Sequence, residues 1–261
     1  MPISDELKAR IEKARSLDGS IIVCLGPSGC GKTDLAVRLS LAAAFIAGVE
    51  WLAYDSNGDV RVHLNGIRAY HRQQFENATT PEERSRHFAK LAFLDKCIRT
   101  GFYSGPSQLP RVMAKLRDMV AQGHVDAKSG KSKKVRAIVF VDEAGAVRDA
   151  NEEFWPAMRQ ARNAGVTIYT TGHRLKDWHP AARANIRVAV VWRPKSAEKF
   201  VDVNGLKIPR EACAEPKGDV VKFWIGDDPV AQCWNRAREP ERYPPELVIP
   251  AQPTVARVAG F

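Results

Sequence analysis

The most constraining feature of this sequence is a glycine-rich segment near its start. Residues 26–33 read GPSGCGKT and fit the pattern G-x-x-x-x-G-K-[ST]. The apolar residues 20–25 (SIIVCL) predict a short buried strand before it, and the apolar spacing of residues 34–47 predicts a helix after it. A glycine-rich turn between a strand and a helix aims backbone N–H groups at a bound phosphate. The sequence therefore predicts a phosphate-binding loop within an α/β fold.

The predicted roles in this loop follow from the chemistry of a nucleoside triphosphate. Lys32 would place its ammonium group against the β- and γ-phosphates, and the Thr33 hydroxyl would help to hold a Mg²⁺ ion. We therefore expect ATP and Mg²⁺ as cofactors. The loop residues predicted to contact the nucleotide are Gly26, Pro27, Ser28, Gly29, Cys30, Gly31, Lys32 and Thr33.

Two acidic residues form the second predicted part of the site. They directly follow residues 137–141 (AIVFV), an apolar run typical of a strand covered on both faces. Because α/β sheets bind ligands at the carboxyl ends of their strands, we expect both acids beside the phosphate loop. Asp142 would hold the Mg²⁺ ion directly or through water, and Glu143 would orient the water that attacks the γ-phosphate. The pair favours hydrolysis, and the absence of N-K-x-D argues against a GTPase.

A third predicted part lies at the end of the strand expected at residues 166–171 (VTIYTT). Its polar residues Thr170, Thr171 and His173 are candidates to sense the γ-phosphate. Of these, we assign Thr171 to nucleotide binding and His173 to catalysis. A structural role, in which these groups only cap the end of a strand, is the alternative.

The order of the remaining segments predicts the architecture. Predicted strands alternate with predicted helices, which indicates an α/β fold with a mainly parallel central sheet flanked by helices. Two apolar runs around Gly-Asp-Asp-Pro, within residues 220–234, predict an edge hairpin. We expect an N-terminal helix at residues 1–19, a nucleotide-binding domain at residues 20–235 and an extended Pro-rich tail at residues 236–261. The start of the chain does not resemble a signal peptide, and its apolar runs are too short for a membrane span.

The charge balance points to a polyanionic partner. The 261 residues include 40 Lys and Arg against 30 Asp and Glu, a formal net charge of +10. The five cysteines form no C-x-x-C pair, which argues for a reducing, intracellular compartment. Residues 57–72 mix basic and aromatic side chains and are one candidate for DNA contact, as a pore loop. The densest basic run is the other candidate, with a solvated loop as its alternative: Lys128, Lys131, Lys133, Lys134 and Arg136.

One stretch of the chain resembles a known family. Residues 161–174 (ARNAGVTIYTTGHR) and 182–187 (ARANIR) are similar to the HerA/FtsK superfamily of DNA-pumping ATPases. The compact length resembles its viral branch, the genome-packaging ATPases of membrane-containing icosahedral viruses. The resemblance covers roughly residues 20–193. One departure is that the sensor Gln of the superfamily is replaced by His173, which adds a titrating group.

This resemblance implies a RecA/FtsK-like P-loop core and ATP-driven translocation of double-stranded DNA by a hexameric ring. Arg162 matches the arginine that a neighbouring subunit supplies to the ATP site, although an exposed helix arginine is the alternative. It further implies capsid-vertex proteins as partners and the host cytoplasm, or the virion, as location. The other candidates for the arginine in trans are Arg159, Arg174, Arg183 and Arg187.

Three alternatives stay open on the sequence alone. The first is a plasmid-transfer or chromosome-partition pump of the same superfamily, which uses the same chemistry. The second is a P-loop kinase that acts on a small acceptor, and the third is an assembly ATPase similar to those of filamentous phages. DNA-stimulated hydrolysis would separate the first from the other two.

Overall fold

The computed structural model describes residues 19, 21–128, 137–150, 153–183, 186–195, 199–203, 206–216, 220–225 and 228–233. The predicted N-terminal helix, apart from residue 19, and the Pro-rich tail lie outside these residues. The strands are β1 (Ile21–Leu25), β2 (Glu50–Asp55), β3 (Phe102–Ser104), β4 (Ala137–Val141), β5 (Thr167–Gly172), β6 (Ile186–Val191), β7 (Phe200–Val203), β8 (Leu206–Pro209), β9 (Val220–Ile225) and β10 (Asp228–Cys233). The α-helices are α2 (Lys32–Ala47), α3 (Asp59–Asn77), α4 (Pro81–Thr100), α5 (Leu109–Lys128), α6 (Ala144–Ala150), α7 (Phe154–Asn163) and α8 (Pro180–Arg183). Three 3₁₀ turns complete the set: η1 (Pro106–Gln108), η2 (Leu175–Asp177) and η3 (Arg210–Ala212).

The centre of the structure is one eight-stranded sheet with the order β10-β9-β6-β1-β5-β4-β2-β3. The strands from β6 to β3 run parallel to their neighbours, while β9 and β10 form an antiparallel hairpin beside β6. The expected α/β fold with a mainly parallel sheet and a C-terminal edge hairpin is therefore confirmed. Neither β3 nor the separate β7–β8 hairpin was predicted from the sequence.

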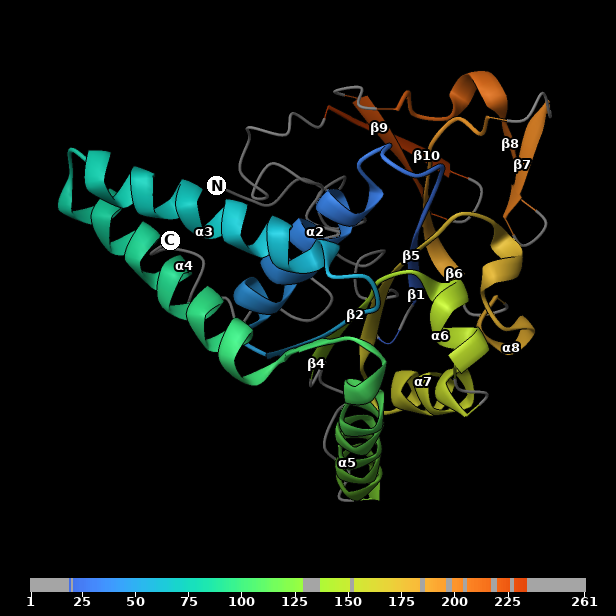
Figure 1. Ribbon diagram of the computed structural model, residues 1–261, viewed down its shortest axis with the longest axis horizontal. Helices are drawn as coiled ribbons and strands as arrows, with labels where there is room; N and C mark the ends of the chain where they lie inside the picture. Colours follow the sequence, from blue (N-terminus) through green and yellow to red (C-terminus); the bar gives the residue numbers. More distant parts are fainter. Residues whose placement is uncertain are drawn as a thin grey trace, which may run out of the picture.

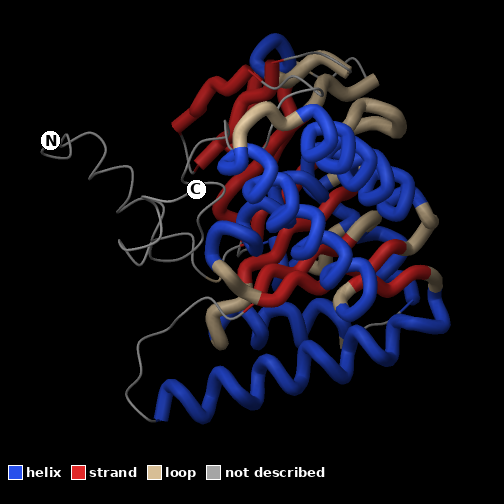
Figure 2. The backbone as a smooth tube through the Cα atoms, turned by 90° about the vertical axis from the view of Figure 1, so that its left-hand side faces the viewer, coloured by secondary structure: helices blue, strands red, loops and turns tan. Residues whose placement is uncertain are grey.

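Helices cover both faces of the sheet, as the views in Figures 1 and 2 show. On β1, Ile22 and Cys24 belong to the core beneath α2, α3 and α4, whereas Ile21 and Val23 belong to the core beneath α5 and α7. This alternation follows from the period of two residues in a strand. Because each face is covered, β1, β4 and β5 are buried along their whole length.

The helices α3 and α4 form a long hairpin that projects from the domain (Figure 1). Val60, Leu64, Ile67 and His71 recur at helical spacing on the buried side of α3, which packs against α4. The prediction of a pore loop at residues 57–72 is therefore wrong, because most of this segment is the first half of α3.

The tip of this hairpin is fixed by local capping. Thr80 caps the start of α4, accepting a hydrogen bond from the Glu83 N–H, and the Glu83 carboxylate accepts from the Thr80 N–H in return. Pro81 occupies the first turn, where its missing N–H costs nothing. A sharp helix start here separates α3 from α4 and sets the hairpin turn.

In the part of the chain that the structure describes, no helix has both the length and the apolar character needed to cross a lipid bilayer.

Candidate active site

The glycine-rich loop connects β1 to α2, as predicted. Gly29 has φ 75° and Gly31 has φ 103°, left-handed values that favour glycine. Gly31 precedes α2 without a side-chain cap, so the first N–H groups of this helix are left for a ligand. A Cβ atom on Gly26 would lie 2.8 Å from Trp192 Cβ and 2.9 Å from Cys30 Sγ, so glycine is required there too. This loop can therefore cradle a phosphate with backbone N–H groups.

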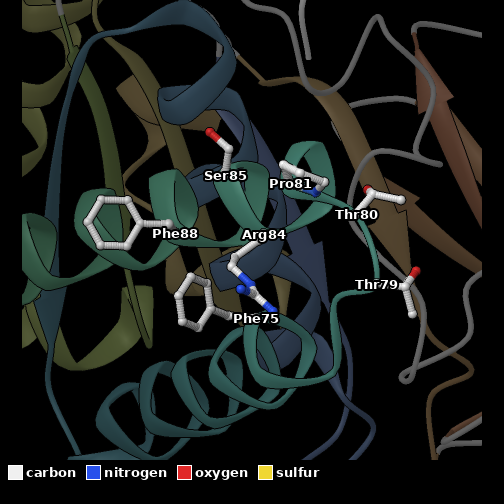
Figure 3. A pocket seen from close by; sticks show the side chains of 7 residues that line it. All are labelled: Phe75, Thr79, Thr80, Pro81, Arg84, Ser85 and Phe88. Carbon is white, nitrogen blue, oxygen red and sulfur yellow. The ribbon is translucent and has the colours of Figure 1, made fainter.

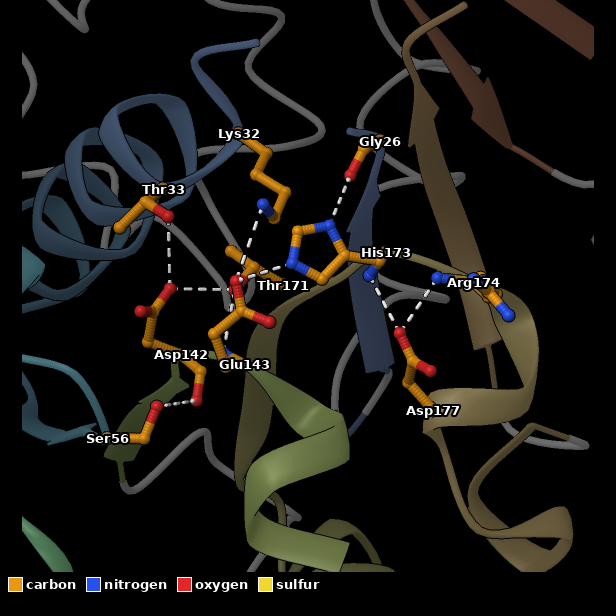
Figure 4. A network of polar contacts seen from close by, with 10 residues as sticks. All are labelled: Gly26, Lys32, Thr33, Ser56, Asp142, Glu143, Thr171, His173, Arg174 and Asp177. Carbon is orange, nitrogen blue, oxygen red and sulfur yellow. Dashed lines mark hydrogen bonds and ion pairs between the residues drawn. The ribbon is translucent and has the colours of Figure 1, made fainter. Parts of the chain in front are cut away.

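The two predicted metal ligands lie together at the carboxyl ends of the strands (Figure 4). The Thr33 hydroxyl donates to Asp142 Oδ1 over 3.1 Å, and the Thr171 hydroxyl donates to the same oxygen over 2.7 Å. The Asp142 N–H donates to the Tyr54 carbonyl on the neighbouring strand β2 over 3.0 Å, which fixes the start of the turn. Strand pairing thus brings Thr33 and Asp142 into contact although they lie far apart in the sequence.

Burial dominates the electrostatics of Asp142. The pKa of this carboxyl is raised to about 6, chiefly by loss of water on burial and also by the nearby charges of Glu143 and Asp55, while hydrogen bonds from Thr171 and Thr33 oppose the shift. Among the described residues, no cation forms an ion pair with Asp142. A carboxylate and a hydroxyl are the hard oxygen ligands that Mg²⁺ prefers, so the pair fits this ion.

Glu143 is held from three sides. It has φ 53°, a left-handed value found among the described residues at no other non-glycine position. Its N–H donates to the Thr171 hydroxyl over 2.9 Å, and its Oε1 lies 3.4 Å from Lys32 Nζ. A strained backbone that is fixed by its surroundings is typical of functional sites. One hydroxyl, that of Thr171, therefore links both acids.

His173 is the third contact of Glu143. Its Nε2 lies 3.2 Å from Glu143 Oε1, and its Nδ1 lies 3.1 Å from the carbonyl oxygen of Gly26 (Figure 4). A carbonyl oxygen only accepts hydrogen bonds, so Nδ1 carries a proton in this arrangement. Asp177 supports the turn, since its Oδ2 accepts from the N–H groups of His173 and Arg174 over 2.8 Å each. His173 thus connects the phosphate loop to Glu143.

The other predicted residues are placed as follows. The Thr170 hydroxyl is buried without a hydrogen-bond partner in the described structure, so it faces the interior. Arg162 lies near the end of α7, but its side chain is outside the described residues, as are those of Arg159 and Arg187. Arg174 is exposed next to His173, and Arg183 donates to the Trp178 carbonyl over 2.9 Å. In the basic run, Lys128 ends α5 and the remaining residues lie outside the description.

Two residues of the site, Ser56 and Asp55, were not predicted from the sequence. The Ser56 hydroxyl donates to the Asp142 carbonyl over 3.4 Å, and Asp55 accepts from the N–H groups of Asn57 and Gly58 ahead of α3. Both follow β2, the strand beside β4. The turn-forming sequence Asp-Ser-Asn-Gly was visible, but its position beside Asp142 depends on the strand order.

Comparisons with known proteins identify the fold. No family model and no curated protein matches this chain. Among solved structures, EssC (ATPases 2 and 3) from Geobacillus thermodenitrificans matches with a TM-score of 0.57 and 15% identity over 88% of this chain. The chain spans 43% of that EssC chain. At this identity the likeness establishes the fold alone, and it confirms the expected α/β fold of a P-loop NTPase.

Two further structures match below a TM-score of 0.5. B204, the DNA-packaging ATPase from Sulfolobus turreted icosahedral virus, has a TM-score of 0.46 and 14% identity, covering 84% of this chain and 98% of its own. The cytoplasmic domain of the type VII secretion ATPase EccC from Thermomonospora curvata has a TM-score of 0.49 and 14% identity, covering 82% of this chain and 25% of its own. The shared fold therefore rests on the EssC comparison.

Proposed function

We propose that this chain is the Mg²⁺-dependent ATPase of a motor that translocates double-stranded DNA. The observation that carries the proposal is the meeting of Lys32 and Thr33 with Asp142 and Glu143 at the carboxyl ends of β1 and β4. These four residues supply the phosphate contact, the metal ligands and the base that hydrolysis of a nucleoside triphosphate requires.

Each side chain has a distinct role in this proposal. When a nucleotide enters the loop, the Lys32 ammonium leaves Glu143 and contacts the β- and γ-phosphates instead. Thr33 and Asp142 would hold the Mg²⁺ ion, which would neutralise charge on the phosphates. Glu143 then keeps His173 as the contact of its Oε1, and its second oxygen is available to accept a proton from the attacking water. His173 acts as a positioning residue that keeps Glu143 beside the phosphate loop.

The site is proposed to be completed by a second copy of the chain. Hydrolysis of ATP by P-loop motors gains several orders of magnitude from an arginine that stabilises the transferring phosphoryl group. Arg162 is the candidate for this residue in a homo-oligomeric ring, with six subunits as the expected number. An Arg162→Ala subunit and a Lys32→Ala subunit, each inactive alone, should recover part of the activity when mixed. No recovery in mixed assemblies would count against a role in trans.

The cargo is proposed from charge and from the sequence resemblance, not from the fold. A formal net charge of +10 favours a polyanion over a neutral polypeptide. Residues 161–174 resemble the HerA/FtsK superfamily of DNA-pumping ATPases, and the compact length resembles its viral branch, so packaging of a genome into a preformed capsid is the specific proposal. Capsid-vertex proteins would then be partners, and the host cytoplasm or the virion would be the location. A plasmid or chromosome pump is the alternative with the same chemistry.

The ATPase rate measured with and without duplex DNA, at 50 and 200 mM salt, tests this function. We expect stimulation by DNA at low salt and a marked loss of stimulation at high salt, because contacts with phosphates weaken steeply as salt rises. Hydrolysis that ignores DNA under both conditions would remove translocation from the proposal. Transfer of the γ-phosphate to a small acceptor in place of water would establish a kinase instead.

A further inference from the structure

One face of the α3–α4 hairpin collects positive charge. Five arginines define it, and we call it the arginine face: Arg61, Arg68 and Arg72 of α3, and Arg84 and Arg99 of α4. None of them belongs to the nucleotide site.

The arginines of α3 share a face because of their spacing. Arg68 lies seven positions after Arg61, and Arg72 lies four positions after Arg68. This spacing places the three side chains within a narrow arc of the helix. Two contacts orient this arc, one with β3 and one across the hairpin with α4. The guanidinium of Arg61 lies 5.5 Å from the ring centroid of Phe102, at the base, and Arg68 Nε lies 2.8 Å from Asp95 Oδ1 on α4. Arg72 follows one turn later and is exposed.

The same face continues along α4 to the tip of the hairpin. The guanidinium of Arg84 lies 5.9 Å from the ring centroid of Phe75, and the Phe75 and Phe88 rings lie 6.2 Å apart. These three side chains line a cavity of about 410 Å³ at the tip (Figure 3). The Phe88 side chain is unusually open for its type, at 62% exposed. At the opposite end, Arg99 lies one turn beyond Asp95 and is exposed.

The charge on this face is only partly compensated. Asp95 forms an ion pair with Arg68. The side chain of Arg68 is 43% exposed and that of Asp95 is 45% exposed. The acids of α3 are Asp59 in its first turn and Glu76 in its last turn, one turn beyond Arg72. In the described part of the chain, Arg72 and Arg99 form no ion pair. The face therefore offers several guanidinium groups to a ligand.

We propose that the arginine face binds the phosphate backbone of duplex DNA. The rise of an α-helix separates Arg61 from Arg68 by about 10 Å and Arg68 from Arg72 by about 6 Å. Phosphates of one strand of duplex DNA advance by about 3.4 Å per nucleotide along the duplex axis, so for an α-helix parallel to that axis these separations match about three and two nucleotides. The inference rests on the proposed function for its choice of ligand, and it assigns the contact to a rigid hairpin rather than to a loop.

Backbone contacts of this kind fix position without reading sequence. Long guanidinium side chains on a helix can follow one strand, while the apolar tip around Phe75 and Phe88 packs against deoxyribose. A hairpin tied to the ATPase core could then report or transmit the state of the nucleotide. Such ties exist, because His63 of α3 lies 3.2 Å from Asp34 in the first turn of α2, and Ser56 contacts the Asp142 carbonyl.

The salt dependence of DNA binding tests the assignment. The variant is Arg61→Gln/Arg72→Gln, which leaves the Arg68–Asp95 ion pair intact. The matched control is Arg111→Gln/Arg117→Gln, which removes the same charge from exposed positions on α5. Binding of a fluorescent 30-base-pair duplex is measured by anisotropy from 50 to 200 mM salt, with thermal melting to check that each variant is folded.

We expect the Arg61/Arg72 variant to reduce the slope of log K against log salt by about 1.8, since each lost phosphate contact removes about 0.9. Affinity at 50 mM salt should fall at least tenfold, and the control should keep the slope of the wild type. An unchanged slope in the Arg61/Arg72 variant, or an equal loss in the control, overturns the assignment to this face. Tighter binding of duplex RNA than of DNA also overturns it.

The outcome separates this inference from the proposed function. If the double variant binds DNA with the affinity and salt slope of the wild type and its ATPase is stimulated as strongly, the hairpin assignment is wrong and the translocase proposal stands. If the wild type neither binds duplex DNA nor responds to it, the translocase proposal fails and the hairpin assignment fails with it. The ATPase rate without DNA should be equal in all three proteins, because neither pair of arginines touches the nucleotide site.

Discussion

Replacement of Asp142 by asparagine should stabilise the metal-free protein at neutral and alkaline pH. In the fold, burial raises the pKa of Asp142 to about 6, from an ordinary value of 3.8. The ionised carboxylate is therefore a cost to the folded state when no metal is bound. Asparagine is close in shape and keeps an oxygen that can accept from Thr33 and Thr171, but it carries no charge.

The size and sign of the effect follow from linkage. One pKa unit corresponds to 1.36 kcal/mol, so a shift of about two units amounts to about 3 kcal/mol. The unfolded chain loses this proton near pH 4 and the folded chain near pH 6, so wild-type stability falls as the pH rises between these values. Below pH 4 the wild type and the variant should be similar. At pH 8 the variant should be more stable by up to about 3 kcal/mol.

Urea denaturation in EDTA at pH 4, 5, 6, 7 and 8 measures this difference. We expect the two curves of unfolding free energy to separate between pH 4 and 6 and then to run parallel. When Mg²⁺ and a nucleotide are added at pH 8, the wild type should become the more stable of the two proteins, because a ligand stabilises the folded protein that binds it. Parallel curves across the whole range, or a variant that is less stable at pH 8 in EDTA, would refute the electrostatic account of Asp142.

Three further substitutions test the support around the acids. Thr171→Val removes the hydroxyl that serves both Asp142 and Glu143, and kcat should fall at least tenfold with a smaller change in KM, whereas Thr171→Ser should keep most of the activity. Gly172→Ala would place a Cβ 2.5 Å from the Trp178 ring, so the free energy of unfolding should fall by about 1–3 kcal/mol; an unchanged Tm would contradict this packing. Glu143→Gly should relieve a left-handed backbone and raise stability by about 1 kcal/mol in urea denaturation, while hydrolysis is lost. A less stable glycine variant would argue against strain at this position.

The local parts of the site were predictable from the sequence. The phosphate loop and the acid pair are contiguous patterns, and each lies at a strand end where the alternation of strands and helices placed it. Thr33 and Asp142, the two residues predicted to hold the metal ion, are joined by a hydrogen bond, and their role as metal ligands stays a prediction. Roles at the nucleotide itself stay predictions, because they concern a ligand.

The parts that depend on strand order were not predictable. His173 meets the Gly26 carbonyl 147 positions away, because β5 lies directly beside β1 in the sheet. Ser56 reaches Asp142 because β2 lies on the other side of β4. No local pattern encodes either neighbour. The strand ends at Asp142 and His173 were expected at the phosphate loop, but the individual contacts of His173 with Gly26 and of Ser56 with Asp142 were not predicted.

The error at residues 57–72 has a different cause. The basic and aromatic residues suggested a DNA-contacting loop, while the spacing of Val60, Leu64, Ile67 and His71 predicts a helix. The periodic pattern decides the structure because a helix of this length gains its stability from burying one apolar side. The charged residues then occupy the remaining surface, where the arginine face lies.

The central claim is that Glu143 activates water for hydrolysis of ATP bound by Lys32 and its loop. The most direct test is Glu143→Gln, measured for binding of a fluorescent ATP analogue and for release of phosphate in a single turnover. Glutamine keeps the size of the side chain but cannot take a proton from water. We predict nucleotide affinity within about threefold of the wild type and a hydrolysis rate at least a hundredfold lower. Hydrolysis at the wild-type rate by this variant would contradict the account.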